Sequence, residues 1–261
     1  MNAPIPISSR DNPLLKDLRR LAHGNTDYRK QARFWAEGDH LVRAALKRGV
    51  RPSVGVFAAS YWPQASAECQ HAADKNVLIP DALFDELSAL ESPARLGFVF
   101  DLPSAAAVQS GVASVVLDRV QDAGNVGAIL RCASAFGFRQ VIALKGTAAL
   151  WSPKVLRAGM GAHWGLHLIE GAALQALEPL RLPLLVTSSH QGDYLHQALA
   201  AGRLPMPCAW ALGHEGQGVC AELQAMASQH VRIAQPGGEE SLNVAAAAAI
   251  CLHASATAAL G

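Results

Sequence analysis

The feature that most constrains this chain is a strand–helix–strand pattern in its second half. Residues 114–117 (SVVL) form a short apolar run of the kind that fills a buried parallel strand. Residues 126–136 carry apolar side chains at helical spacing and end before Gly137, and a second apolar run follows at residues 140–144 (QVIAL). A single helix that connects two such strands joins them in parallel. The pattern therefore predicts an α/β domain built on a parallel sheet.

A stretch rich in small residues and proline, residues 103–112, reads as a linker between two domains. We expect a small α/β domain over residues 1–102 and a larger one over residues 113–261. Expected elements of the first domain are helices at 14–22, 40–48 and 81–89 and strands at 54–58, 77–79 and 96–100. Expected further elements of the second are strands at 184–187, 208–212 and 231–233, a helix beginning at Ser152 and Pro153, and a last helix beginning near Asn243.

The positive charge of the chain is concentrated near its beginning. Residues 1–52 hold 11 Lys or Arg and 5 Asp or Glu, a balance of +6, whereas the remaining residues have a balance of −5. Within the helix expected at 14–22, Lys16, Arg19 and Arg20 lie off the apolar stripe. With Arg33 they are candidates for contacts to nucleic-acid phosphates. The alternative is a basic helical face that is simply solvated.

Composition disfavours a membrane protein and a metal centre. The apolar run that begins at Val244 contains His253, Ser255 and Thr257, and much of it is alanine, so a buried helix is expected rather than a membrane span. The five cysteines are scattered without a CxxC pair, which favours free thiols in the cytoplasm. His163 and His167 have the i, i+4 spacing of zinc ligands, but the glutamate of an HExxH motif is absent, so we expect no metal.

Three loops follow expected strand ends, where ligands bind in open parallel sheets. They are residues 118–125, residues 213–218 (GHEGQG) and residues 234–243 (AQPGGEESLN). None contains the glycine pattern of a dinucleotide-binding or triphosphate-binding loop. The serine hydrolase elbow G-x-S-x-G is also absent, and either Ser241 or Asn243 could be a helix N-cap.

Taken together, these loops resemble the SpoU (TrmH-type) 2′-O-ribose RNA methyltransferases of the SPOUT superfamily. The first family motif, N-x-G-x-x-x-R, is matched by Asn125, Gly127 and Arg131. The second, G-x-E-x-x-G, is matched by Gly213, Glu215 and Gly218. The third, I-P-M-x-G-x-x-x-S-L-N-V, is matched by Ile233, Gly237, Ser241, Leu242, Asn243 and Val244. Ala234 and Gln235 depart from the usual Pro and Met of that motif.

The resemblance covers nearly the whole chain and carries expectations about fold, cofactor and partners. It implies a catalytic domain whose C-terminal part forms a deep trefoil knot, preceded by an RNA-substrate-binding domain. The implied cofactor is S-adenosylmethionine, and the implied assembly is a homodimer in which the first motif of one subunit meets the pocket of the other. The residues implied to contact the cofactor are Leu212, Gly213, Gly218, Ile233, Gly237 and Leu242.

The resemblance also implies catalytic roles for Asn125, Arg131, Glu215, Ser241 and Asn243. Arginine remains protonated at neutral pH, so we expect Arg131 to act as an electrostatic clamp rather than as a base. Asn125 is expected to hold the ribose or Arg131, and Glu215 to pair with a positive group such as Arg131. Ser241 and Asn243 are expected to line the substrate side. The expected reaction is methylation of a ribose 2′-hydroxyl in structured RNA, with 23S ribosomal RNA favoured. Transfer RNA, or a non-catalytic RNA-binding protein that retains the knot, are the alternatives.

Overall fold

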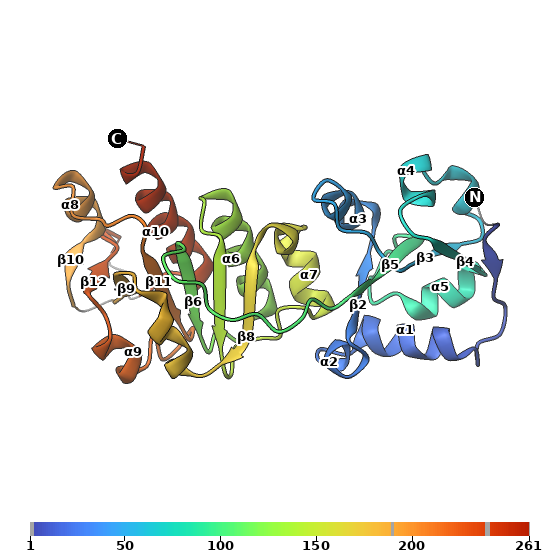
Figure 1. The fold of residues 1–261 in the computed structure, drawn as a ribbon, viewed down its shortest axis with the longest axis horizontal. Coiled ribbons are helices and arrows are strands. Elements are labelled where there is room, and N and C mark those ends of the chain that lie inside the picture. The colour runs from blue at the N-terminus through green and yellow to red at the C-terminus, as the bar shows by residue number, and fades with distance from the viewer. Residues whose placement is uncertain (1–2, 189–190, 238–240, 261) are drawn as a thin grey trace. The chain divides into compact units, whose positions relative to one another are not determined.

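The structure is a computed structural model that describes residues 3–188, 191–237 and 241–260. The chain divides into two compact units (Figure 1). The first unit contains residues 1–104 together with residues 151–164, and the second contains residues 105–150 and 165–261. The chain therefore passes from one unit to the other three times. Residues 151–164, which the sequence places in the second domain, belong to the first unit.

The first unit is built on a five-stranded mixed sheet of order β1-β4-β3-β5-β2. Its strands are β1 (Ile5–Pro6), β2 (Arg33–Glu37), β3 (Val54–Ala58), β4 (Lys75–Ile79) and β5 (Leu96–Asp101). Its helices are α1 (Pro13–His23), α2 (Asp27–Gln31), α3 (Asp39–Leu46), α4 (Ala67–Gln70), α5 (Asp81–Leu87) and α7 (Pro153–Gly159), with short 3₁₀ turns at Trp62–Gln64 and Ala162–Gly165. Strand β5 pairs antiparallel with β2 and β3, while β3, β4 and β1 run parallel.

Helix α1 shows why these residues fold as predicted. The side chain of Asn12 accepts a hydrogen bond from the Leu14 N–H at 2.9 Å, and proline occupies the first helical position. Leu15, Leu18 and Leu21 are buried along one face, as the helical spacing predicts. The expected helix at 14–22 is confirmed.

Aromatic side chains bring residues 151–164 into the core of the first unit. The rings of Phe34 and Trp151 lie 4.7 Å apart, and those of Phe100 and Trp164 lie 4.6 Å apart. The Trp164 indole N–H also donates to the Leu41 carbonyl at 3.2 Å. These contacts make the inserted segment part of the apolar core of this unit.

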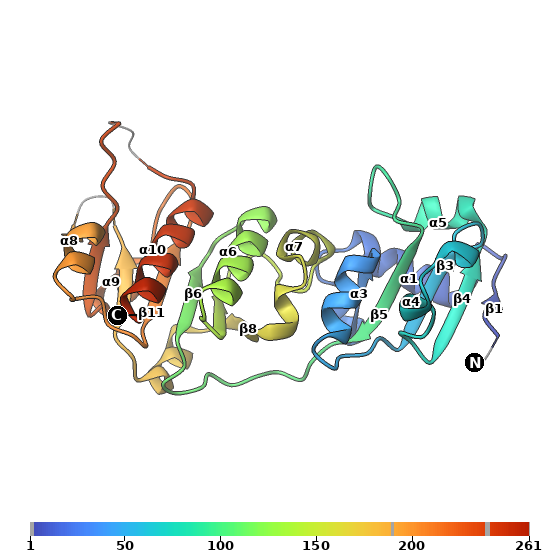
Figure 2. The same ribbon diagram turned by 90° about the horizontal axis from the view of Figure 1, so that it is seen from above.

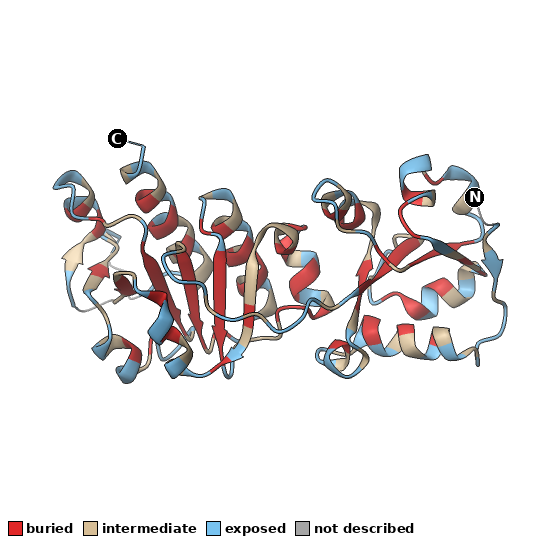
Figure 3. Cartoon of the chain, in the orientation of Figure 1, coloured by how far each residue is buried: buried red, intermediate tan, exposed pale blue. Residues whose placement is uncertain are grey.

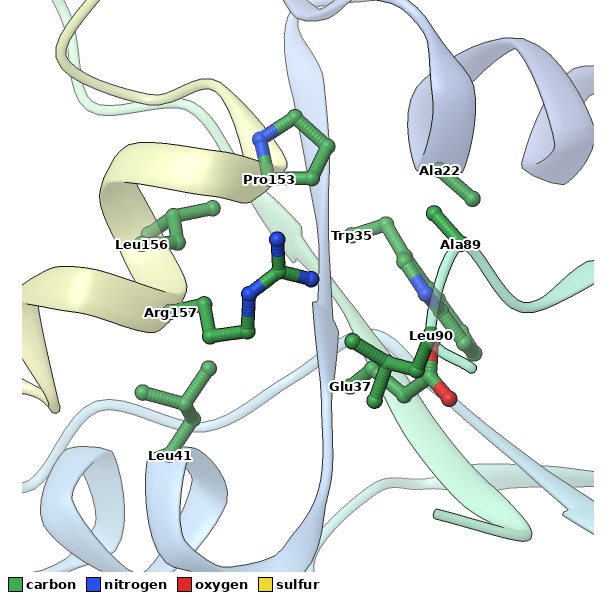
Figure 4. A pocket seen from close by; sticks show the side chains of 9 residues that line it. All are labelled: Ala22, Trp35, Glu37, Leu41, Ala89, Leu90, Pro153, Leu156 and Arg157. Atoms are coloured by element: carbon green, nitrogen blue, oxygen red, sulfur yellow. The ribbon is translucent and has the colours of Figure 1, made fainter. Parts of the chain in front are cut away.

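A small cavity lies between helix α7 and strand β2 of the same unit (Figure 4). Its walls include Trp35, Glu37, Leu156 and Arg157. The cavity volume is about 30 Å³, which leaves room for a water molecule or two but not for a cofactor.

The second unit contains a seven-stranded sheet of order β10-β12-β9-β11-β6-β7-β8 in which every neighbouring pair is parallel. Its strands are β6 (Ser114–Asp118), β7 (Gln140–Leu144), β8 (His167–Ala172), β9 (Leu184–Thr187), β10 (Asp193–Tyr194), β11 (Ala209–Gly213) and β12 (Gln229–Arg232). Every residue of β6, β7 and β11 is buried (Figure 3). The predicted parallel α/β architecture is confirmed.

The helices of the second unit are α6 (Ala123–Ala135), α8 (Leu195–Ala200), α9 (Ala221–Ala225) and α10 (Val244–Ala258), with a 3₁₀ stretch at Leu174–Leu180. Helices α6 and α10 run side by side (Figures 1 and 2). On the inner face of α10, Ser255 accepts a hydrogen bond from the Trp210 indole at 2.9 Å, whereas Ile250 on the same helix is exposed. Among the described residues, every helix is too short or too polar to cross a bilayer.

Two strands of the second unit escaped prediction from the sequence. Strand β8 contains Glu170 and Gly171, and its register against β7 shifts between Ala143 and Leu144, so its apolar pattern is interrupted. Strand β10 is only two residues long. The trefoil knot implied by the family resemblance stays a prediction, because strand order alone does not define how the loops thread.

Candidate functional site

An open pocket lies in the second unit where strands β9, β11 and β12 end. Its volume is about 580 Å³, within the range of small-molecule sites. The lining comes from residues 213–219 after β11, from Ser241–Asn243 and the start of α10, and from residues that follow β9 and β12. The carboxyl ends of parallel strands are where ligands bind in open α/β sheets, so the position and size of the pocket suit a ligand.

The loop after β11 is held in a tight hairpin that only glycine permits at two positions. A Cβ on Gly213 would lie 2.1 Å from the backbone carbon of Gly218, and Gly218 itself has φ +67°. The backbones of His214 and Gly218 exchange two hydrogen bonds of 3.1 and 2.8 Å. These constraints give a physical reason for both glycines of the second motif.

The side chain of His214 stabilises the same hairpin. Its Nδ1 accepts hydrogen bonds from the backbone N–H groups of Gly216 at 3.0 Å and Gln217 at 3.2 Å. The neutral imidazole must then carry its proton on Nε2.

The carboxylate of Glu215 connects this hairpin to the start of helix α6. It accepts hydrogen bonds from the Gln121 N–H at 3.3 Å, the Asp122 N–H at 3.2 Å and the Asn125 side-chain amide at 3.0 Å. Burial raises the pKa of Glu215, but the hydrogen bonds from Asn125 and from backbone amides, including those of Asp122 and Gln121, together hold it below its ordinary value. The residue is therefore a structural anion rather than a proton donor at neutral pH.

Asn125 and Asn243 extend this network to the third motif. The Asn243 amide donates to the Asn125 side-chain oxygen at 2.9 Å, and its own oxygen caps α10 by accepting from the Ala245 and Ala246 N–H groups at 2.9 and 3.2 Å. The side chain of Asp122, the N-cap of α6, in turn accepts a hydrogen bond from the backbone N–H of Asn125. One hydrogen-bonded chain, Glu215–Asn125–Asn243, thus joins all three motifs.

A second polar pair supports the pocket and was not identified from the sequence. Asp118, buried at the end of β6, accepts the Cys220 N–H at 2.7 Å and pairs with Arg119 at 3.0 Å. Arg119 also donates to the Gln217 side chain at 2.9 Å. Burial alone would raise the pKa of Asp118, but the hydrogen bonds from Arg119 and Cys220 outweigh this effect and hold the pKa below its ordinary value. Asp118 is therefore ionised at neutral pH. An acidic residue directly after a buried strand was the available signal.

The structure gathers most of the predicted site residues in the pocket. Those that line it are Gly213, Glu215, Gly218, Ile233, Ser241, Leu242 and Asn243. Leu212 is buried in β11 next to the pocket, whereas Gly237 and Asn125 do not line it.

Arg131 lies apart from these residues on the exposed side of α6 and does not line the pocket. Among the described residues of this chain, the Glu215 carboxylate is held by amide N–H groups. Its expected pairing with a positive group such as Arg131 stays a prediction.

The predicted RNA-contacting residues of the first unit are mostly engaged with acids. Lys16 pairs with Asp11 at 2.9 Å, Arg19 with Glu86 at 3.3 Å and Arg20 with Asp17 at 3.8 Å. Arg33 lies in strand β2, and no ion-pair partner is found for it within the described part of the chain. The exposed pairs among these residues are weak in water, so their charges remain accessible to a polyanion.

Comparison with known proteins identifies the family. Residues 113–253 match the SpoU rRNA Methylase family, and because the match spans more than half of the chain, the chain belongs to this family. The chain is 29% identical over 253 residues to the 23S rRNA (guanosine(2553)-2′-O)-methyltransferase RlmP of Bacillus subtilis (strain 168), covering 95% of this chain and 97% of that protein.

Solved structures share the whole fold. An AdoMet-bound rRNA methyltransferase from Sinorhizobium meliloti is 26% identical with a TM-score of 0.81, covering 96% of both chains. An RNA 2′-O ribose methyltransferase is 28% identical with a TM-score of 0.79, covering 98% of this chain and 100% of the other. The resemblance seen in the three motifs is confirmed.

Proposed function

We propose that this protein transfers a methyl group from S-adenosylmethionine to a ribose 2′-hydroxyl of ribosomal RNA. The observation that carries the proposal is the convergence of the second and third motifs on one pocket, with the first motif tied to them through the Glu215–Asn125–Asn243 chain. The family match and the activity named for the Bacillus subtilis relative support the same reaction.

The pocket fits S-adenosylmethionine in size and in chemistry. About 580 Å³ accommodates a nucleoside with an amino acid attached, and the glycines at 213 and 218 let the backbone approach a ligand closely. Gly213, Gly218, Ile233 and Leu242 would hold the cofactor, with Leu212 and Gly237 shaping the loops around them. When bound, the cofactor supplies an electrophilic methyl group on a sulfonium.

The residues of the chain would then position the ribose and stabilise its developing negative oxygen. Arg131 acts as a fixed positive charge near the 2′-oxygen and an adjacent phosphate, because a guanidinium does not give up its proton near neutral pH. Ser241 and Asn243 line the side on which the substrate enters. Glu215 and Asn125 keep the loops in place. Fixed loops hold the 2′-oxygen in line with the methyl group, and this positioning lowers the barrier to an in-line displacement.

The position of Arg131 favours a homodimer. Asn125 and Arg131 are six residues apart on one helix, so their side chains point about 120° away from each other. Asn125 faces the network of its own pocket, and Arg131 therefore faces elsewhere. In the proposed dimer, Arg131 of one subunit completes the pocket of the partner, and the exposed face of α10 around Ile250 is the apolar surface available for pairing.

The first unit is proposed to bind the RNA through its basic residues, Lys16, Arg19, Arg20 and Arg33. The five free cysteines suit a reducing compartment, so we place the enzyme in the cytoplasm.

The proposal is tested by incubating the purified protein with S-adenosylmethionine and unmodified ribosomal RNA, then digesting the RNA to nucleosides for mass spectrometry. We expect one 2′-O-methyl nucleoside, mapped to one site. Transfer RNA is the parallel substrate, and exclusive methylation there would replace ribosomal RNA in the proposal. RNA binding without cofactor binding would instead identify a non-catalytic RNA-binding protein.

A further inference from the structure

We infer that the side chain of Gln235 is a hydrogen-bond acceptor for the cofactor. The inference rests on the proposed function, because it assigns a ligand-binding role to a residue in the pocket described above. Gln235 follows β12 in the third motif and lines the pocket.

The observation behind this inference is an unpaired buried oxygen. The Oε1 atom of Gln235 is buried and has no hydrogen-bond partner among the described residues. Within the described part of the second unit, it is the one buried side-chain polar atom in this condition. A buried acceptor without a partner destabilises the folded protein, and such groups in native proteins call for an explanation.

The neighbouring polar side chains make Gln235 an exception. Gln224 lines the same pocket, and its amide donates to the Val219 carbonyl at 2.7 Å. Glu215 and Asn243 are likewise hydrogen-bonded within the protein. Among the described residues that line the pocket, Gln235 is the one whose buried side-chain oxygen has no hydrogen-bond partner.

S-adenosylmethionine carries donors that could satisfy this oxygen: the adenine amine, the ribose hydroxyls and the ammonium of its amino acid part. Methionine, the usual residue of the motif at this position, offers no comparable acceptor, since its thioether is only a weak one. Gln235 would thus add a hydrogen bond that the motif itself does not provide, and would contribute to cofactor affinity.

The test is calorimetric binding of S-adenosylmethionine and S-adenosylhomocysteine to the full-length protein. The variants are Gln235→Met, which keeps length but loses the acceptor, and Gln235→Glu, which keeps acceptors but loses the amide donor. Gln175→Met, the same change at an exposed residue outside the pocket, is the matched control. We expect Gln235→Met to weaken binding roughly 5- to 150-fold, as for a ligand donor left unpaired. Gln235→Glu should stay within about threefold of the parent protein, and Gln175→Met should not differ from it.

Thermal unfolding without ligand separates this role from a structural one. Because Gln235→Met removes an unpaired buried oxygen, the ligand-free variant should unfold at the same or a higher temperature, with a smaller stabilisation by ligand. A lower unfolding temperature without ligand, together with unchanged affinity, would overturn the inference. Equal losses in both Gln235 variants would also overturn it, because they would mean that the amide donates rather than accepts.

Methylthioadenosine, which lacks the amino acid part, locates the donor. If the loss in Gln235→Met persists with this ligand, the donor belongs to the nucleoside; if the loss disappears, it belongs to the amino acid part. Absence of any binding to the parent protein would refute the proposed function itself, whereas equal binding by the parent and Gln235→Met would refute only the role of Gln235.

Discussion

The two units use their polar side chains in different ways. In the second unit, Glu215, Asn125 and Asn243 bond to one another and to backbone amides at the rim of a pocket. In the first unit, basic side chains such as Lys16 and Arg20 pair with partly or fully exposed carboxylates on the same surface. Hydrogen bonds therefore fix the positions of the polar side chains around the proposed active site. The basic side chains proposed to bind RNA form only weak, solvent-exposed ion pairs.

Arg131 is the strongest test of this contrast between the two units, because it is an exposed residue of the second unit to which we assign a catalytic role. Arg131→Ala should reduce methyl transfer roughly 100- to 1,000-fold, the loss typical of one preorganised donor to a developing oxyanion. Cofactor affinity, measured by calorimetry, should not change. Arg131→Lys, which keeps the charge but not the planar fork, should recover only part of the activity. Full activity of Arg131→Ala would mean that Arg131 has no catalytic role and is only a solvent-exposed helix residue.

Trp164 tests whether the inserted segment is integral to the first unit. Trp164→Ala should lower the free energy of unfolding by about 2–3 kcal/mol, somewhat less than for a fully buried tryptophan, because Trp164 is half-buried. Trp164→Phe, which keeps ring contacts with Phe100 but loses the bond to Leu41, should cost about 1 kcal/mol. Chemical denaturation of the two variants gives both values. Equal stability of Trp164→Ala and the parent protein would contradict the prediction.

Glu215 tests the restrained geometry of the pocket. Glu215→Gln should destabilise the protein at neutral pH by about 1 kcal/mol, because an amide cannot accept three bonds from N–H groups as a carboxylate does and because solvent reduces the effect at this exposed residue.

The pKa of Glu215 is lowered in the folded protein, so its stabilising contribution is present above the ordinary glutamate pKa and is lost as pH falls through the lowered value. Between neutral pH and about pH 3, the free energy of unfolding of Glu215→Gln should therefore fall less than that of the parent protein, as measured by denaturation curves. Parallel acid limbs in the two proteins would argue against the carboxylate network.

Glu86 tests the proposed RNA binding of the first unit, and its substitution has the smallest expected effect of these variants. It pairs with Arg10 at 2.9 Å and with Arg19 at 3.3 Å. Arg19→Gln should weaken RNA binding and lower the salt slope of log affinity by about 0.7–0.9, whereas Glu86→Gln should strengthen binding by releasing both arginines. Affinities measured over a salt series decide the question. If neither variant changes the slope, these arginines do not contact RNA phosphates.

Much of the second unit could be predicted because its signals are local. The apolar runs of β6 and β7, the helical stripe between them and the Asn243 cap each depend on neighbouring residues. Motif spacing likewise identified eight residues that line one pocket, the seven predicted site residues and Val244. The amide N–H groups that hold Glu215 could not be predicted, because they depend on which donors the fold brings to its carboxylate, and spacing does not specify that.

The sequence by itself determined the family, the parallel sheet and the loops that form the pocket, because periodicity, capping and glycine positions act over a few residues. Only the tertiary structure decided that residues 151–164 belong to the core of the first unit, that Asp118 and Arg119 support the pocket, and that Gln235 holds an unpaired acceptor in its wall. Each of these depends on which atoms distant in the chain are brought together, since burial and hydrogen-bond partners are properties of the packed chain.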